Sequence, residues 1–261
     1  MTTTFDKGLA LLHAVLAAEL GPAGYPGNAH LAEQVGLDQT QVSRMLKDLA
    51  AVNLVERDEQ IRGWRVGPMY FALAKAAGDR QLLVPARPLL RGLVARWHEP
   101  AWLSVRSRDT ALTVEAQLSH WSSHVAANLG ARLPIWCTGA GRALLLDHSE
   151  AELGRLLTDV DFIGGGPRAA RDTAALARYN AVARAEGVVI ADREFEHDVV
   201  DFSAPVRDKS GSIVAAVSLA VPRFRLAGRS AEIAASVREA AHVLEVRAAS
   251  RAERTDDRPS P

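Results

Sequence analysis

Residues 31–49 read LAEQVGLDQTQVSRMLKDL, a pattern that predicts two short helices joined by a tight turn. Gly36 falls between them, where the turn of a helix-turn-helix unit often needs a glycine. Asp38 is placed to cap the second helix, because a carboxylate accepts hydrogen bonds from the unpaired N–H groups at a helix N-terminus. The apolar side chains of the second helix share one face: Val42, Met45, Leu46 and Leu49.

The opposite face of this helix carries side chains of the kinds that contact DNA. Gln and Thr reach base edges, Arg reaches guanine or phosphate, and Lys reaches phosphate. Every surface helix has a polar face, so this pattern alone leaves an ordinary solvated helix open. The candidate DNA contacts on the helix are Gln39, Thr40, Gln41, Ser43, Arg44 and Lys47.

The stretch that follows, NLVERDEQIRGWRVG (residues 53–67), reads as two short strands joined by a charged turn. Strands over 54–57 and 63–66 would form a β-wing directly after the second helix, which favours the DNA-binding interpretation over that of a plain surface helix. Three arginines of the wing are candidate contacts to the phosphate backbone: Arg57, Arg62 and Arg65.

An amphipathic segment precedes these elements. Residues 5–20 predict a longer helix that braces the pair from behind through Leu9, Leu12, Val15 and Leu16. Three helices and a wing make a winged helix-turn-helix DNA-binding domain, which we expect over residues 1–67. Residues 1–78 hold seven Lys and Arg against eight Asp and Glu, so this part is not basic overall. Affinity for DNA must then depend on a few well-placed basic side chains and on two copies that bind together.

The whole chain has 261 residues, enough for one or two domains with apolar cores, and its formal net charge of zero argues against a polybasic protein. A single cysteine, Cys137, excludes an intrachain disulfide and fits a reducing cytoplasm. No apolar run approaches the roughly 18 to 20 residues of a membrane span, and the N-terminus lacks the features of a signal peptide. The polar, proline-containing residues 251–261 predict a disordered tail.

After the wing, residues 68–80 predict a linker helix that begins with Pro68 and is apolar enough to pair with its copy in a dimer. From residue 81 to 250 the pattern changes to alternating strands mixed with helices. Strands are expected over 101–109 and 110–118 around a turn at Arg108–Asp109, in a strand and loop over 124–136, and over 188–196, 199–208 and 212–222. Helices are expected over 86–99, 138–147, 149–159, 173–187 and 227–249. An antiparallel sheet with helices on its faces indicates an α+β sensor-like module.

Two stretches resemble the effector domain of IclR-family transcriptional regulators: LPIWCTGAGRALL (133–145) and GVVIADREFEHDVVDFSAPVRDKSGSIVAAVSLAVP (187–222). The family pattern has a Leu-Pro, a small-residue loop and Gly-Lys-Ala-Leu, then later an acidic run, Ala-Pro-Val, Arg, Asp and a glycine turn. The resemblance covers nearly the whole chain, because the winged helix and linker follow the family order. It implies a GAF-like effector-binding domain, dimers that often pair into tetramers, and regulation by small molecules, often carboxylates or aromatic catabolites.

The segment CTGAGRALL supports a ligand loop on its own chemistry. Thr138 is placed to cap a helix whose first turn is Gly139, Ala140 and Gly141, and small residues allow a ligand to approach the free N–H groups there. The alternative is that the glycines only permit tight packing of the helix on the sheet. The resemblance favours the ligand loop.

The resemblance also implies further effector-binding positions. These are apolar walls at Val125 and Val199, Asp192 in the acidic run, and a hydroxyl at Ser218. Separately, Trp136 and Phe202 near this site favour a partly apolar or ring-bearing ligand, although either could equally be core. Two positions depart from the family pattern, since Asp198 replaces a frequent glycine and Asp201 replaces a Cys or Ser that faces the pocket. A carboxylate there would repel an anionic effector unless it is protonated or paired with a cation. Asp201 could instead accept hydrogen bonds from hydroxyl groups or bind an amine.

Other candidate sites are weaker. His120 and His124 are four residues apart, but in a strand and turn they need not face the same way, and Cys137 could be a redox sensor although a lone semi-buried cysteine is usually inert. His197, Asp198 and Asp201 suggest acid–base chemistry, yet no nucleophile completes a catalytic set. We therefore expect no catalytic site, metal or cofactor.

These patterns together predict a ligand-responsive, DNA-binding transcriptional regulator, expected to be a repressor. Its partners would be double-stranded operator DNA, an aromatic or polar organic effector, and a second copy in a homodimer or a dimer of dimers, with no membrane. Two alternatives stay open. The C-terminal domain could be an enzyme acting on a small catabolite, or the chain could be a constitutive DNA-binding protein whose second domain only mediates assembly.

Overall fold

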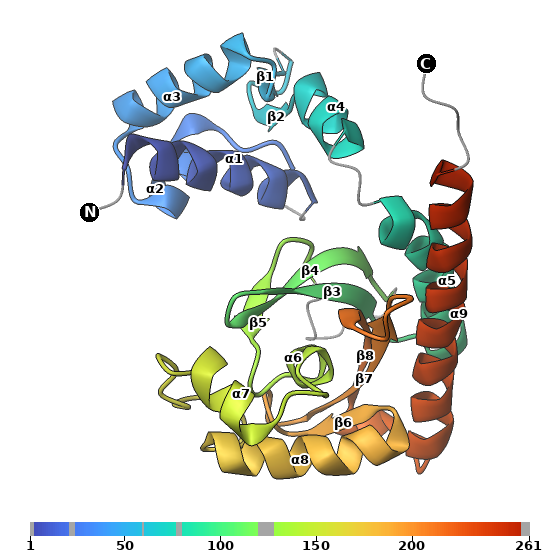
Figure 1. Ribbon diagram of the computed structural model, residues 1–261. Coiled ribbons are helices and arrows are strands. Elements are labelled where there is room, and N and C mark those ends of the chain that lie inside the picture. Colours follow the sequence, from blue (N-terminus) through green and yellow to red (C-terminus); the bar gives the residue numbers. More distant parts are fainter. Residues whose placement is uncertain (1–2, 21–23, 59, 77–79, 120–127, 257–261) are drawn as a thin grey trace. The chain divides into compact units, whose positions relative to one another are not determined.

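The computed structural model describes residues 3–20, 24–58, 60–76, 80–119 and 128–256 (Figure 1). Its contacts separate two compact units, Met1–Gly78 and Asp79–Pro261. The division falls inside the segment 68–80 that the sequence predicts as a linker helix. Among the described residues, no helix is both long enough and apolar enough to span a membrane.

The N-terminal unit is a winged helix-turn-helix. Three helices come first, α1 (Thr4–Leu20), α2 (Asn28–Val35) and α3 (Gln39–Ala51), followed by an antiparallel pair, β1 (Val55–Arg57) and β2 (Trp64–Val66), and by α4 (Pro68–Ala76). Gly36 ends α2 in the left-handed conformation, with φ of 66°, as the turn requires. The predicted order of elements is confirmed, and each strand begins one residue later than expected.

The core of this unit forms where α1 crosses the other two helices. Leu11 and Val15 of α1 and Leu46 of α3 are fully buried in it. Leu9, which was expected in this core, is half exposed instead. The α1 sequence is apolar on more than one face, so its pattern predicts an amphipathic helix without deciding which leucines face inward.

The C-terminal unit has a six-stranded antiparallel sheet in the order β5-β4-β3-β8-β7-β6. The strands are β3 (Ala101–Ser107), β4 (Thr110–Gln117), β5 (Arg132–Pro134), β6 (Val189–Asp192), β7 (Val199–Arg207) and β8 (Ile213–Pro222). The helices are α5 (Arg80–Trp97), α6 (Gly139–Leu144), α7 (Glu150–Leu156), α8 (Thr173–Glu186) and α9 (Ser230–Asp256), with a 3-10 turn at Arg223–Arg225. In Figure 1, α5 and α9 lie side by side along one face of the sheet, and α6 lies on the other face with α7 and α8 beyond it.

Strand β7 shows how the sheet separates two layers. Val200, Phe202 and Ala204 belong to the core beneath α5 and α9. The alternate residues Asp201 and Ser203 face α6, where they lie against Gly139. Because side chains alternate along β7, burying Val200, Phe202 and Ala204 in the α5–α9 core places Asp201 and Ser203 beneath α6.

Several local predictions are confirmed and others need correction. The turn at Arg108–Asp109, the hairpin around residues 208–211 and the left-handed Gly187 at the end of α8 are present. Strand β6 is shorter than expected because Arg193, with φ of 58°, takes the chain out of the sheet. Helix α9 continues to Asp256, so residues 251–256 are helical rather than the disordered tail predicted for 251–261, and 257–261 lie outside the described residues. The fold class, α+β with a winged helix-turn-helix and an antiparallel sheet with helices, is confirmed.

Candidate nucleic-acid interface and effector site

Helix α3 presents a polar outer face, as its sequence predicts. Asp38 caps it by accepting a hydrogen bond of 2.8 Å from the Gln41 N–H. Val42, Met45 and Leu46 are buried and fix the rotation of the helix. Among the expected DNA contacts Gln39, Thr40, Arg44 and Lys47 are exposed, and Gln41 and Ser43 are half-buried.

The wing is fastened to the helices by two polar contacts that the sequence does not reveal. The Trp64 indole N–H donates to Asn28 Oδ1 at 2.7 Å, and the Val66 N–H donates to Glu19 Oε2 at 2.8 Å. Arg57 and Arg62 are exposed on the wing. Arg65 is different, because its guanidinium forms an ion pair of 2.6 Å with Glu56 on the other strand. Arg65 therefore meets a phosphate group less readily than Arg57 and Arg62 do.

The loop that precedes α6 has the expected cap. The Thr138 hydroxyl accepts a hydrogen bond from the Gly141 N–H at 3.1 Å and donates one to the Pro134 carbonyl at 2.8 Å. A Cβ atom on Gly141 would stand 2.2 Å from the Ile135 carbonyl oxygen. Gly141 is therefore required for tight packing within the protein. For this glycine the structure supports the packing alternative rather than a role in ligand binding.

Asp201 lies directly beneath the start of α6. Its Oδ2 accepts a hydrogen bond from the Gly139 N–H at 3.4 Å, and a Cβ atom on Gly139 would stand 2.6 Å from the Asp201 Cβ. Burial raises the pKa of Asp201 to about 7; the Gly139 N–H opposes this shift, and the charge of Glu196 adds to it. The structure thus places a carboxyl group that readily holds a proton at the predicted ligand loop.

Two serines lie beside Asp201 on the same face of the sheet. Ser203 Oγ and Ser218 Oγ are 2.8 Å apart and fully buried. Ser203 would also lie 2.7 Å from a Cβ on Gly139, so Gly139, Asp201, Ser203 and Ser218 form one contiguous group. Ser203 was not among the residues predicted for this site, although in a strand it shares one face with Asp201, two residues earlier.

Apolar side chains adjoin this group. Val199, on the same strand face, packs with Trp102, Ala116 and Ala220. Trp102 pairs with Ser218 across the neighbouring strands β3 and β8. Trp102 is therefore a second candidate wall residue that the sequence patterns did not single out.

The other expected effector positions do not join the group equally. Trp136 is almost fully buried against Phe162, with ring centroids 5.1 Å apart, and Ala140 is buried in the same core. Trp136 is therefore a core side chain, which is one of the two roles that the sequence left open. Phe202 is also a core side chain, on the opposite face of the sheet. Val125, His120 and His124 lie outside the described residues.

Asp192 belongs to an ionic cluster instead. Arg168 binds its Oδ2 at 2.6 Å, Arg223 binds its Oδ1, and Arg193 lies 3.8 Å away. Burial alone would raise the pKa of Asp192, but the hydrogen bond from Arg223 and the charges of the arginines lower it below the ordinary value. With these partners, Asp192 ties the 192–193 turn to neighbouring loops.

A second polar pair, buried beside α6, was also missed. Arg142 donates to Glu194 Oε1 at 2.6 Å and to Asn180 Oδ1 at 3.1 Å, and its guanidinium lies 5.3 Å from the centre of the Tyr179 ring. Burial raises the pKa of Glu194 to about 7 against the opposing effect of Arg142. The arginine in GAGRALL could have indicated this pair, because an arginine in a short buried helix needs an acidic or polar partner.

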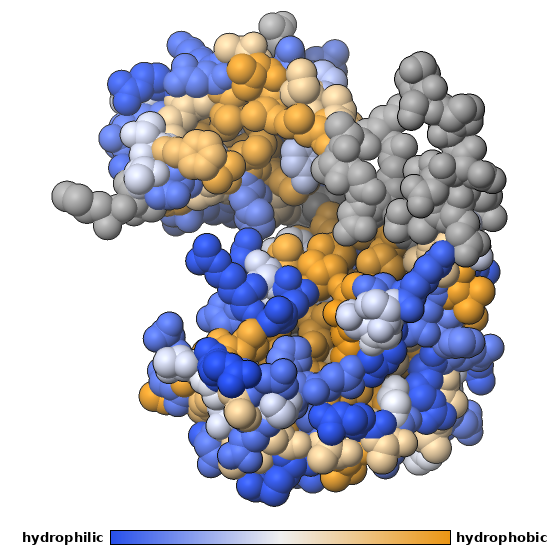
Figure 2. Space-filling view, in the orientation of Figure 1, coloured by the Kyte–Doolittle hydropathy of each residue, from blue (hydrophilic) through white to orange (hydrophobic). Residues whose placement is uncertain are grey.

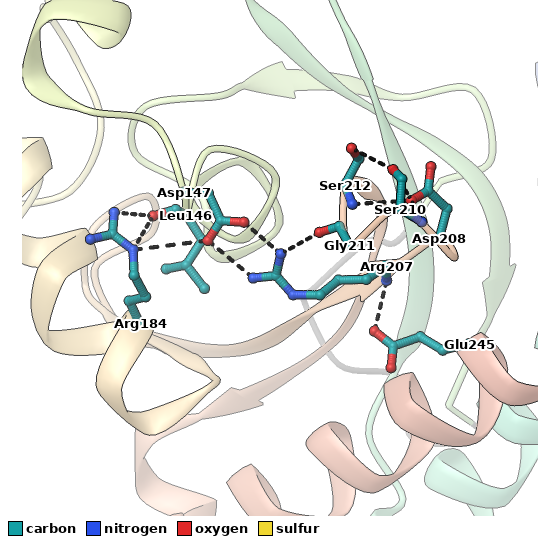
Figure 3. Close-up of polar contacts among 9 residues, drawn as sticks. All are labelled: Leu146, Asp147, Arg184, Arg207, Asp208, Ser210, Gly211, Ser212 and Glu245. Atoms are coloured by element: carbon teal, nitrogen blue, oxygen red, sulfur yellow. Dashed lines mark hydrogen bonds and ion pairs between the residues drawn. The ribbon is translucent and has the colours of Figure 1, made fainter.

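The Ala-Pro-Val-Arg-Asp motif has a structural role at the end of the β7–β8 hairpin. The Arg207 guanidinium binds both oxygens of Asp147 after α6 and the Gly211 carbonyl (Figure 3). The Arg207 backbone N–H donates to Glu245 of α9 at 2.7 Å. Asp208 accepts hydrogen bonds from the N–H groups of Ser210 and Ser212 and so closes the turn. This network joins the hairpin to helices on both faces of the sheet.

The candidates for chemistry other than binding gain no geometric support. His197 and Asp198 are exposed on the loop before β7. Burial raises the pKa of Cys137 to about 12, which disfavours the reactive thiolate. Within the described ranges, no group of three or more His, Cys, Asp and Glu side chains is arranged to hold a metal ion.

Comparison with known proteins assigns the chain. The model of the bacterial transcriptional regulator IclR C-terminal domain matches residues 74–246, and that of the IclR helix-turn-helix domain matches residues 4–59. The chain belongs to the IclR family. It is a DNA-binding transcriptional regulator, which confirms the function class expected from its sequence.

Individual relatives agree with this family assignment. The HTH-type transcriptional regulator BhcR of Paracoccus denitrificans is 30% identical over 216 residues, which cover 82% of this chain and 77% of BhcR. The repressor AllR of Escherichia coli K12 is 26% identical over 85% of this chain and 80% of its own. An IclR homologue from Microbacterium hydrocarbonoxydans, solved with 4-hydroxybenzoate, has the same fold, with a TM-score of 0.76, 21% identity, and coverage of 94% of this chain and 99% of that one.

Proposed function

We propose that this IclR-family regulator is a cytoplasmic repressor that binds a pseudo-palindromic operator as a homodimer and responds to a small organic molecule in its C-terminal unit. The observation that carries the proposal is the outer face of α3. It is exposed, polar and rigidly set by the Asp38 cap and by three buried side chains, as a recognition helix needs to be. The name of the relative AllR, a repressor, supports the direction of regulation.

The charge of the N-terminal unit supports binding by two copies. Its basic residues do not outnumber its acidic ones, so a single unit has little general attraction for DNA. Two units on one operator multiply their modest affinities without new contacts. We expect the two α3 helices to enter successive major grooves, with half-sites about one helical turn apart.

An apolar surface on α1 and α4 supplies a face for the second copy. Phe5 and Phe71 are 72% and 62% exposed, and Leu9, Met69 and Leu73 are also exposed. A groove of about 410 Å³ lies between the two helices, lined by Leu9, Leu12, His13, Leu16 and Tyr70, with Ala10. Figure 2 shows apolar side chains gathered on the visible face of this unit. Such a patch on a monomer usually marks an interface, and we propose that the copy's own α1 and α4 cover it.

The effector site that we propose is centred on the half-buried Asp201, with Val199 beside it and the buried Gly139, Ser203 and Ser218 against it. An effector that binds one arrangement of the dimer about 1 to 3 kcal/mol more tightly than the other shifts operator affinity by the same amount. We expect no turnover of the effector and no cofactor. His197 and Asp198, the candidates for an enzymatic role, are exposed on a loop, and no contact in the described residues links them to a nucleophile.

Fluorescence anisotropy with DNA from upstream of the protein's own gene tests this function. A random duplex of equal length is measured in parallel at two salt concentrations. Specific binding that weakens with salt is expected. Arg44→Ala should weaken it by about 1 to 3 kcal/mol if Arg44 contacts a base, whereas Arg178→Ala, at an exposed arginine on α8, should leave it unchanged. Equal binding of both duplexes would contradict the proposal.

A further inference from the structure

The carboxyl group of Asp201 already occupies the place where an anionic ligand would meet α6. Its Oδ2 accepts the Gly139 N–H at 3.4 Å. The approach between the two residues is so close that not even a Cβ atom fits on Gly139 without a contact of 2.6 Å to Asp201. A ligand carboxylate would have to displace Asp201 or lie next to another negative charge, and both are unfavourable.

The charges around Asp201 are also wrong for an anion. Two arginines of this unit form ion pairs with other carboxylates: Arg142 with Glu194, and Arg223 with Asp192. Among the described residues, no Lys or Arg forms an ion pair with Asp201, and the charge that acts on its carboxyl is that of Glu196. The negative charge of Asp201 likewise raises the pKa of Glu194. The site therefore has no cation to pair with the Asp201 carboxylate, and a positively charged ligand can supply one.

The surroundings define the rest of the ligand. Ser203 and Ser218, on the same face of the sheet, are fully buried and hydrogen-bond to each other at 2.8 Å, whereas Asp201 is only half-buried and is the polar group of these three that a ligand can reach. Val199 packs with Trp102 beside them and offers an apolar wall. A molecule that suits this surface combines a cationic hydrogen-bond donor with an apolar body.

We propose that the effector of this regulator carries a protonated amine that pairs with the carboxylate of Asp201, on an apolar body that packs against Trp102 and Val199. This inference rests on the proposed function, because it takes this surface to be the effector site. It separates this chain from relatives that bind a carboxylate, such as the one solved with 4-hydroxybenzoate. An ion pair in a partly buried site is expected to favour the amine over a neutral isostere by about tenfold or more.

Isothermal titration with three ligands that share one ring tests the proposal: benzylamine, benzyl alcohol and benzoate. The intact protein should bind benzylamine at least tenfold more tightly than benzyl alcohol and should bind benzoate least. Asp201→Ser should abolish the preference for the amine and raise the affinity for benzoate. Asp198→Ser removes an exposed carboxylate from the same segment, and should keep the order of the intact protein. Thermal melts establish that both variants are folded.

Three results would overturn the proposal: benzoate binding as well as benzylamine, an amine preference that survives Asp201→Ser, or no binding of any of the three ligands. Anisotropy with the upstream DNA, measured on the same preparations, separates this failure from that of the proposed function. Specific DNA binding together with the wrong ligand order refutes the amine alone. Equal binding to upstream and random DNA refutes the regulator assignment to that operator, whatever the ligands do.

Discussion

The buried pair of Arg142 and Glu194 allows a sharp test of the energetics of the C-terminal unit. Their side chains are only 4% and 7% exposed, and the pair joins α6 to the turn after β6. Removing one partner of such a pair leaves the other charge buried, at a cost of about 3 to 5 kcal/mol. Replacing both partners by apolar side chains of similar volume is often neutral, because the desolvation of both charges is also removed.

The two single substitutions should not be equivalent. In Glu194→Leu the Arg142 guanidinium cannot lose its proton and keeps only the Asn180 oxygen and the Tyr179 ring, so we expect the full loss of about 3 to 5 kcal/mol. In Arg142→Met the remaining carboxyl can take up a proton, since burial already raises the pKa of Glu194 to about 7. We therefore expect a loss of about 1 to 3 kcal/mol for Arg142→Met.

Urea unfolding followed by tryptophan fluorescence at pH 7 measures these differences, with Trp136 in the core beside α6 as a reporter. The double variant Arg142→Met/Glu194→Leu should unfold within about 1 kcal/mol of the unchanged protein. Equal losses in the two single variants would refute the proton argument. A double variant as unstable as the sum of the singles would refute the pairing itself.

Three further predictions follow from contacts in the same unit. Gly139→Ala should lower the free energy of unfolding by about 1 to 3 kcal/mol, because its Cβ meets Asp201 at 2.6 Å, whereas Gly154→Ala, with open space around it in α7, should raise it by about 0.5 to 1 kcal/mol in the same denaturation assay. Burial raises the pKa of Asp201 and of Glu194 from 3.8 and 4.5 to about 7, so the folded chain holds more protons than the unfolded chain between pH 4 and 7. The free energy of unfolding should therefore fall as the pH rises through this window, and Asp201→Asn should flatten the slope; a rise with pH would contradict the shifts. Cys137 should resist alkylation by iodoacetamide in the folded protein, because burial raises its pKa to about 12, and should react once urea unfolds the chain; equal rates in both states would contradict this.

Local patterns in the sequence determined most of the architecture. The spacing of Val42, Met45 and Leu46 defined α3 and its buried face, and Asp38 marked its first turn. The glycine at 187 ended α8, and the turn residues at 208–211 closed the last hairpin. Each of these signals acts within one or two turns of the chain, where backbone geometry and capping depend on neighbouring residues alone.

The tertiary structure decided which polar groups meet and which apolar faces are buried. Asp201 lies 62 residues from Gly139, and Glu194 lies 52 residues from Arg142, so no local spacing could join either pair. The sequence left Trp136 open between pocket and core, and α1 between two apolar faces, until packing assigned each one. Periodicity says that a side chain lies on one face of an element, but its pKa, partner and exposure depend on what the fold brings against that face.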